Sequence, residues 1–295
     1  MIGCDIRKQR WPKLRKNIPL KDHLVKKIIN YARLTRLHNN LITVFSVLVG
    51  TTVSGIVLSR ERVLFACLSA FFISAGGNVI NDFFDIEIDR INKPNRPLPR
   101  GEISPRSALL FSILLFLTGL FLSFWVRPLA CLFALVACGL LVAYSYALKR
   151  TLIWGNLTVS AVAALTFIYG GMVTEDFRLS LIPAAFALLF HLGREIMKDI
   201  EDIEGDSSAG ATTLPIKLGA KFSVNMCTLV FVSLIVLTTL PYFLHIFSFL
   251  YLLAVVLGVD MILIYVIWSM QKYHSPSNLH RLSNILKIDM LIGLL

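Results

Sequence analysis

Long apolar runs occupy most of this chain and leave little room for a soluble domain. Eight runs of about 18 or more mostly apolar residues, the length that spans a bilayer, fall at 41–59, 63–81, 107–126, 128–148, 152–173, 179–194, 222–244 and 247–270. A ninth begins near Leu282 and reaches Leu295, which is too short to cross a bilayer, so we expect the last helix to be incomplete. Hydrophobic residues make up 56% of the 295 positions, above the usual share in soluble domains. The sequence therefore predicts an all-α fold, a multi-pass membrane bundle of about nine helices.

The basic residues follow a topological pattern. Most of the 29 Lys and Arg residues precede Asn39 or lie in the loops after the second, fourth and sixth apolar runs. The positive-inside rule places the N-terminus and these loops in the cytoplasm. Because topology accounts for the net charge of +11, we expect no nucleic-acid partner. Residues 1–36 are predicted to be a basic cytoplasmic segment against anionic lipid, and residues 37–295 a membrane domain.

Two acidic motifs share one spacing. Their members are Asn78, Asp82, Asp85 and Asp89 in the first, and Glu195, Asp199, Asp202 and Asp206 in the second. Positions i, i+4, i+7 and i+11 predict that each motif lines one face of a helix. Both motifs end an apolar run on the predicted cytoplasmic side, where carboxylates beside a membrane core are costly unless positive charge joins them. One such cluster could be a solvated helix end, but two of equal spacing favour a shared cavity.

Oxygen-rich clusters of this kind suit Mg²⁺, which binds through a few carboxylates together with substrate phosphates. The loop RINKPNRPLPRGEIS follows Asp89 and supplies cations that could neutralise phosphate oxygens, among them Arg90, Lys93 and Arg96. Lys149 lies at the same membrane level in YSYALKR. The alternative is that these cations serve the positive-inside topology alone. We predict a magnesium–diphosphate site on the cytoplasmic side.

A few further polar residues lie in or beside apolar runs. Asn39 and Asn40, in LTRLHNN, could line the polar end of a cavity or cap a helix. Tyr146 could line the cavity or lie at the membrane interface. His191, one turn before Glu195, is expected to support that face. Asp260 interrupts an apolar run, and a packing or hydrogen-bonding role is expected for it ahead of catalysis.

These motifs resemble those of the UbiA-type intramembrane prenyltransferases. NDFFDIEID resembles the first aspartate motif of that family and KDIEDIEGD the second. YSYALKR, followed by Gly155 and Asn156, is similar to the family's loop after its fourth helix. The likeness covers roughly residues 30 to 295. It implies a bundle of nine membrane helices around a central cavity that opens laterally to lipid.

The resemblance also implies a reaction: a prenyl group moves from a polyprenyl diphosphate to a lipophilic acceptor, with Mg²⁺ between the aspartates and the diphosphate. The residues that it implies as metal ligands are Asn78, Asp82, Asp85, Asp202 and Asp206. Asp89 belongs to the same catalytic set and would act through water or a basic residue. The residues predicted to contact the diphosphate are Asn81, Arg90, Lys93, Arg96, Lys149, Lys198 and Asp199.

The acceptor is less constrained by the residues. DIEIDRINKPNRP, REIMKDIEDIEGD and TLPIKLG look most like the archaeal-lipid branch, whose members carry geranylgeranyl from its diphosphate to geranylgeranylglycerol phosphate. The second motif is shared with branches that prenylate homogentisate or chlorophyllide, so an aromatic or tetrapyrrole acceptor stays open. A cation transporter is the alternative of another class, because two acidic repeats in a membrane bundle could bind and pass cations.

Overall fold

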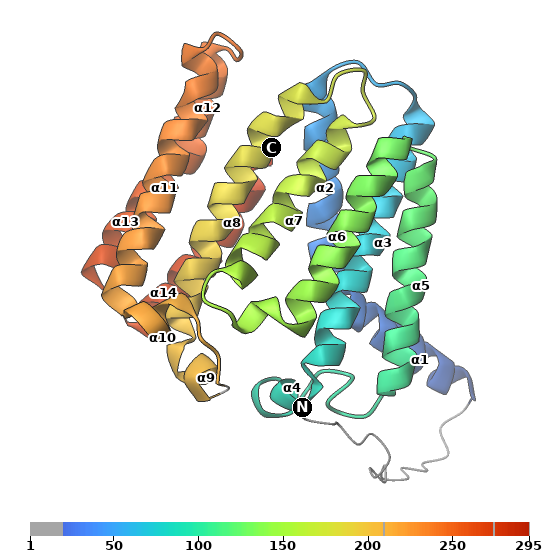
Figure 1. Cartoon of the computed structure of the whole chain (residues 1–295). Helices are drawn as coiled ribbons and strands as arrows, with labels where there is room; N and C mark the ends of the chain where they lie inside the picture. Colours follow the sequence, from blue (N-terminus) through green and yellow to red (C-terminus); the bar gives the residue numbers. More distant parts are fainter. Residues whose placement is uncertain (1–19, 209, 274, 295) are drawn as a thin grey trace.

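The computed structural model describes residues 20–208, 210–273 and 275–294, so most of the predicted basic segment 1–36 lies outside the described residues. Long helices run up and down side by side as one bundle (Figure 1). The helices are α1 (Leu20–Thr35), α2 (Leu37–Ser54), α3 (Arg60–Phe84), α4 (Ile86–Asn92), α5 (Pro105–Phe124), α6 (Pro128–Tyr146), α7 (Trp154–Gly171), α8 (Leu181–Glu201), α9 (Ile203–Ser208), α10 (Leu214–Leu218), α11 (Ala220–Phe243), α12 (Phe249–Val255), α13 (Met261–Lys272) and α14 (Pro276–Gly293). No strand occurs in the described ranges. The predicted all-α fold is confirmed.

Helix boundaries follow local chemistry. Ser59, Ser104 and Ser275 cap α3, α5 and α14, and each serine oxygen accepts the N–H three residues on. Proline stands in the first turn of α5, α6 and α14, where its missing N–H costs nothing. After α4, Pro94 and Pro97 keep the chain irregular up to the cap of α5.

Six helices of the described chain are long and apolar enough to cross a membrane: Arg60–Phe84, Pro105–Phe124, Pro128–Tyr146, Arg178–Glu201, Ala220–Phe243 and Phe249–Lys272. The predicted count of about nine is therefore not confirmed. Helices α2 and α7 lie within the same bundle but begin with polar residues that face its interior, among them Asn40 and Asn156. Polar side chains that serve an internal site lower the apolarity of the helix that carries them.

Small residues bring the central helices close together. A Cβ at Gly50 of α2 would lie 2.0 Å from the carbonyl oxygen of Phe167, and one at Gly170 of α7 would lie 2.0 Å from that of Val47. The Thr51 hydroxyl donates to the Gly170 carbonyl at 2.9 Å across this crossing. Such close backbone approach is typical of membrane helix packing. It fixes α2 and α7, two walls of the site described below.

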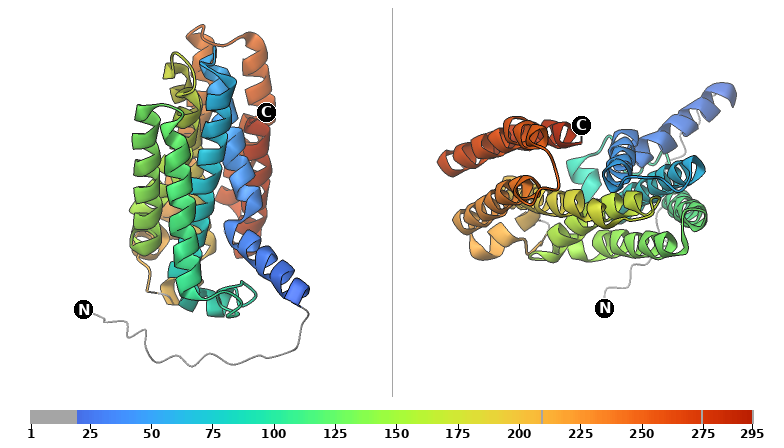
Figure 2. Two further views of the ribbon diagram at one scale, coloured as in Figure 1. Left: turned by 90° about the vertical axis from the view of Figure 1, so that its right-hand side faces the viewer. Right: turned by 90° about the horizontal axis from the view of Figure 1, so that it is seen from above.

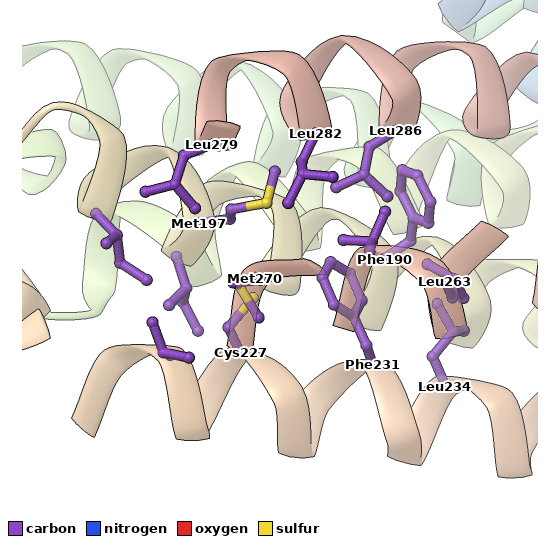
Figure 3. Close-up of a cluster of buried hydrophobic side chains, with 14 of the residues drawn as sticks. Phe190, Met197, Cys227, Phe231, Leu234, Leu263, Met270, Leu279, Leu282 and Leu286 are labelled. Carbon is purple, nitrogen blue, oxygen red and sulfur yellow. The ribbon is translucent and has the colours of Figure 1, made fainter. Parts of the chain in front are cut away.

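Apolar side chains from α8, α11, α13 and α14 fill one half of the bundle (Figure 3). Phe231 of α11 packs over Gly193 of α8, where any added Cβ would clash with its ring. A second cluster joins α3, α5, α6 and α7 around Phe116 and Tyr169. Many large apolar residues on the outer faces are exposed, for example Leu110 and Phe121 of α5. Apolar outer faces on long helices suit lipid as the surrounding solvent, as expected of an integral membrane protein.

Helix α1 leaves the lower end of the bundle at an angle (Figures 1 and 2). The short helices α4, α9 and α10 gather at that same end, opposite to α12 (Figure 1). Both acidic motifs therefore meet at one end of the molecule.

Candidate active site

The first acidic motif spans a break between two helices. Asn78, Asn81 and Asp82 lie on the last turns of α3, and Asp89 lies on α4. Asp85 stands at the break with φ −94° and ψ 4°, and its N–H still donates to the Asn81 carbonyl at 3.0 Å.

The second motif breaks at the corresponding residue. Glu195, Lys198 and Asp199 lie on α8, Asp202 takes φ −97° and ψ 12°, and Asp206 follows on α9. The prediction that each motif lines one face of a single helix was wrong in its last turn. The break redirects the final aspartate, so each motif is a bent arm at the end of the bundle (Figure 1).

Arginine side chains neutralise the first motif. Asp82, only 3% exposed, pairs with Arg36 and accepts from Arg96 at 2.9 Å. Arg96 also pairs with Asp89 at 2.5 Å. Lys149, in the 3-10 turn Leu148–Arg150 that follows α6, pairs with Asp85. Buried carboxylates require such partners, because an unpaired charge in this environment would be costly.

Arg36 was not among the predicted site residues. It links α1 to α2 at φ 52° and ψ 64°, a left-handed conformation that costs a non-glycine residue about 1–2 kcal/mol. Its ion pair with the buried Asp82 compensates for that strain. Arg36 belongs to the segment LTRLHNN, but no local spacing in the sequence predicts its contact with Asp82, which lies 46 residues further along the chain.

The second motif is less fully paired. Glu195 contacts Arg194 at 3.0 Å and Lys198 at 3.5 Å, and Asn156 of α7 donates to Asp199 at 2.7 Å. Within the part of the chain that the structure describes, the carboxylates of Asp202 and Asp206 make no hydrogen bond or ion pair. Burial raises the pKa of both, and the charge of Asp202 raises the pKa of Asp206 further. Mutual repulsion of this kind favours a bound cation.

One lysine connects the two motifs electrostatically. Burial and the neighbouring Arg96 lower the pKa of Lys93, while Asp89 raises it. Lys198 of the second motif also acts on Lys93, and Lys93 in turn stabilises the charge of Asp202. The arms are therefore close enough to act on one ligand.

A cavity of about 940 Å³ opens between these arms. Its polar part is lined by Arg36, Asn39, Asn78, Asn81, Asp85, Lys93, Arg96, Lys149, Arg194, Glu195 and Lys198. Beyond these residues the walls become apolar, with side chains such as Ile73, Leu141, Phe186 and Phe190. This arrangement suits a ligand with a multiply charged head and a long hydrocarbon tail.

The other predicted residues divide into three groups. Asn39 and Asn81 line the cavity. Asn40 is fully buried and supports the wall, since its Oδ1 accepts from Asn78 at 3.1 Å and from Ser74 at 2.9 Å. Arg90 and Tyr146 lie away from the cavity, as the next paragraph describes.

Arg90 pairs with Glu87 on the exposed side of α4 and is not among the cavity-lining residues. Tyr146 is 74% exposed and packs on Phe84 outside the bundle. Tyr144 occupies the inward position instead. Two residues along a helix turn the side chain by about 200°, so only one of the two tyrosines can face the cavity.

The donor set of this site suits a hard cation. Within the described ranges no three carboxylate, histidine or cysteine side chains already stand close enough together to hold a metal. The carboxylates of Asp202 and Asp206 are nevertheless unpaired in the described chain but are not among the cavity-lining residues, whereas Asn78, Asn81 and Asp85 of the first motif do line the cavity. Oxygen donors without sulfur or imidazole favour Mg²⁺ over softer metals, in company with phosphate oxygens.

The model of the UbiA prenyltransferase family matches residues 43–288. The chain is 39% identical over 232 residues to digeranylgeranylglyceryl phosphate synthase from Methanosphaera stadtmanae, covering 79% of this chain and 85% of the relative. The enzyme of that name from Sulfolobus acidocaldarius is 36% identical, over 89% and 95% of the two chains.

Solved structures of an enzyme of the same name and of a UbiA homolog are also similar to this chain. A structure of digeranylgeranylglyceryl phosphate synthase superimposes with a TM-score of 0.78 at 36% identity, over 91% of this chain and 96% of the other. A UbiA homolog from Archaeoglobus fulgidus bound to GPP and Mg²⁺ gives a TM-score of 0.66, over 90% and 98%. At 19% identity, that second likeness is evidence for the fold alone.

Proposed function

Because the chain belongs to the UbiA prenyltransferase family, we propose that it transfers geranylgeranyl from geranylgeranyl diphosphate to the free hydroxyl of geranylgeranylglyceryl phosphate, with Mg²⁺. The main observation behind this proposal is the pair of bent acidic arms at the mouth of a cavity that is polar at one end and apolar beyond. Such a cavity fits an amphiphile whose diphosphate meets the arms. The relatives at 34–39% identity that are named digeranylgeranylglyceryl phosphate synthase support this acceptor.

The metal would be held by Asn78, Asp82, Asp85, Asp202 and Asp206. Bound there, Mg²⁺ supplies Lewis-acid stabilisation of the negative charge that grows on the leaving diphosphate. Arg96 and Lys149 now neutralise carboxylates of the first motif. When those carboxylates bind divalent ions, both cations can pair with diphosphate oxygens instead, Arg96 in bidentate fashion.

The basic residues at the mouth stabilise the leaving group in the same way. Lys93 and Lys198 line the cavity from the two arms, so a diphosphate between them meets positive charge on both sides. Departure of the diphosphate breaks the C1–O bond and leaves positive charge on the allylic carbon. The charges of Lys93 and Lys198 are therefore placed where negative charge develops, which is the condition for effective electrostatic catalysis.

The apolar part of the cavity holds the prenyl tail and keeps water away from the reacting carbon. Phe186 and Phe190 of α8 face Ile73 of α3 and Leu141 of α6 around this space. An allylic cation in contact with water would be hydrolysed, so exclusion of water favours attack by the acceptor hydroxyl. Ether formation then completes the transfer.

A cation transporter is the less well supported of the two functions. Transport sites tend to lie near the middle of the membrane, whereas both arms lie at one end of the bundle (Figure 1). We also propose that this end, with α1, faces the cytoplasm. The enrichment of Lys and Arg in its loops supports that orientation.

An acceptor panel tests this function. Purified protein in lipid receives radiolabelled geranylgeranyl diphosphate and Mg²⁺ with geranylgeranylglyceryl phosphate, homogentisate or 4-hydroxybenzoate. We expect label only in the glycerol ether, and none when EDTA is added or when Asp202 is changed to Ala. Labelling of an aromatic acceptor alone would refute the proposed acceptor. Full turnover in EDTA would refute the role of magnesium.

A further inference from the structure

His191 lies where the cavity changes from polar to apolar. Along α8, the cavity-lining side chains run from Lys198 through Glu195 and Arg194 to His191, and then continue as Phe190 and apolar residues. At 1.5 Å per residue, His191 stands about 6 Å further into the bundle than Glu195. The boundary between charged head and hydrocarbon tail of a bound prenyl diphosphate is its C1–O bond. His191 therefore lies where the polar and apolar parts of the cavity meet, the level at which this bond would lie.

One nitrogen of the His191 imidazole is left without a hydrogen bond among the described residues. This atom, Nδ1, is buried. Buried polar atoms in native proteins are almost always paired, so this one requires an explanation. The His191 side chain lines the cavity, where a bound ligand would meet the ring. A neutral imidazole has one nitrogen lone pair, which can accept a proton from a hydroxyl.

Several other acidic and basic groups of the polar mouth are already paired with one another. Asp85 pairs with Lys149, and Glu195 pairs with both Arg194 and Lys198. Glu195 lies one turn from His191 along α8, and both side chains line the cavity.

Besides the exposed imidazole of His38 at the polar mouth, Asp289 is a rival among the unpaired cavity-lining groups of the described chain. Both oxygens of its carboxylate are buried without a partner, and it lies on α14. It stands near Asp260, which accepts from Thr238 at 3.1 Å close to the far end of α11. Asp289 therefore belongs to the end of the cavity away from the acidic arms, and the tail, not the reacting bond, would lie beside it. Lys287 also comes from α14 but its Nζ donates to Asn284 at 2.9 Å.

We propose that His191 is the general base of the transfer, a role that rests on the proposed prenylation of a hydroxyl. The acceptor oxygen forms the new bond to C1, and the C1–O bond to the diphosphate breaks with its electron pair leaving on the diphosphate. The hydroxyl proton passes to the free lone pair of the His191 imidazole. The ring later releases that proton to solvent through the polar mouth, and Glu195 stabilises the charged ring in between.

The test combines substitution with chemical rescue. His191→Gln keeps the size of the side chain without a base, and His191→Gly leaves space for added imidazole. We expect kcat to fall by roughly 10²–10⁴-fold in both, with the KM for geranylgeranyl diphosphate little changed. Added imidazoles should restore turnover of His191→Gly, and the restored rate should rise with the basicity of the imidazole. A residue that only packs the wall would not respond in this way.

His245→Gly is the matched control. It removes an exposed imidazole outside the cavity. His245 has φ 57°, a left-handed conformation that glycine adopts without strain. It should keep wild-type kcat and gain nothing from imidazole. Unchanged kcat in His191→Gln would overturn the assignment, as would a loss of turnover in Asp289→Asn together with no rescue of His191→Gly. If the wild-type protein prenylates no glycerol ether at all, the proposed function fails instead, and that result is separate.

Discussion

Single charged side chains hold the active end together before any substrate binds. Arg96 bridges Asp82 and Asp89, which lie on different helices of the first arm. Arg36 and Lys149 reach the same arm from the link between α1 and α2 and from the segment between α6 and α7. Each cation compensates a carboxylate that the metal would otherwise compensate, so these residues are placed to exchange partners when a diphosphate binds.

Lys149→Ala should weaken the binding of geranylgeranyl diphosphate. A hydrogen bond to a charged group contributes about 1.5–3 kcal/mol, so Kd should rise roughly 10- to 100-fold. Arg178→Ala is the control. Arg178 is an exposed cation between α7 and α8, at the other end of the bundle, where it pairs with Asp176. Titration with a non-hydrolysable diphosphate analogue in Mg²⁺ measures both. Equal affinity in wild type and Lys149→Ala would remove Lys149 from the diphosphate site.

For single residues, the sequence predicted which residues belong to the site better than it predicted the contacts between them. The repeated spacing identified Asp82, Asp85, Asp202 and Asp206 as a set, and all lie at the same end of the bundle. It did not identify Arg36 or the pairing of Asn156 with Asp199. Such contacts depend on how distant helices meet, and no local period carries that information.

The observed helices differ from the predicted ones mainly at their ends. The apolar runs correctly predicted long helices, but not the breaks at Asp85 and Asp202. Neither residue is followed at once by proline or glycine, the usual local signals of a helix end. The breaks are clear only from the backbone, where both residues take nearly the same φ and ψ.

The crossing of α2 and α7 gives a prediction for stability. Gly50→Ala should destabilise the fold by about 1–3 kcal/mol or more, because the new Cβ meets the Phe167 backbone, which cannot yield as a side chain can. Gly139→Ala, in α6, is the matched control, since its Cβ would meet nothing within 4 Å. Thermal unfolding of both variants in lipid or detergent compares them. A Gly50→Ala variant as stable as Gly139→Ala would mean that α2 and α7 do not approach this closely.

The whole molecule has two different ends, and its function depends on which compartment each faces. The acidic arms and the basic loops share one end, while the loop between α7 and α8 lies at the other (Figure 1). This separation agrees with the order of basic and non-basic loops in the sequence. The number of spanning helices was harder to predict, because α2 and α7 carry polar residues for the cavity.

Thiol labelling tests the orientation. In a background without native cysteines, Glu204→Cys places a thiol on α9 and Glu175→Cys places one on the opposite loop. A membrane-impermeant reagent added to intact cells should label only Glu175→Cys, and permeabilised cells should show both. Labelling of only Glu204→Cys in intact cells would reverse the proposed topology.

The central claim is that the two acidic arms act together on one magnesium–diphosphate group. A double-mutant cycle of Asp82→Asn and Asp202→Asn measures this directly, with the affinity for a non-hydrolysable geranylgeranyl diphosphate analogue in Mg²⁺ as the readout. Shared ligation predicts that each single change weakens binding and that the two effects couple by about 0.5–3 kcal/mol. Effects that add within about 0.3–0.5 kcal/mol would show that the two carboxylates act independently and would contradict the shared site.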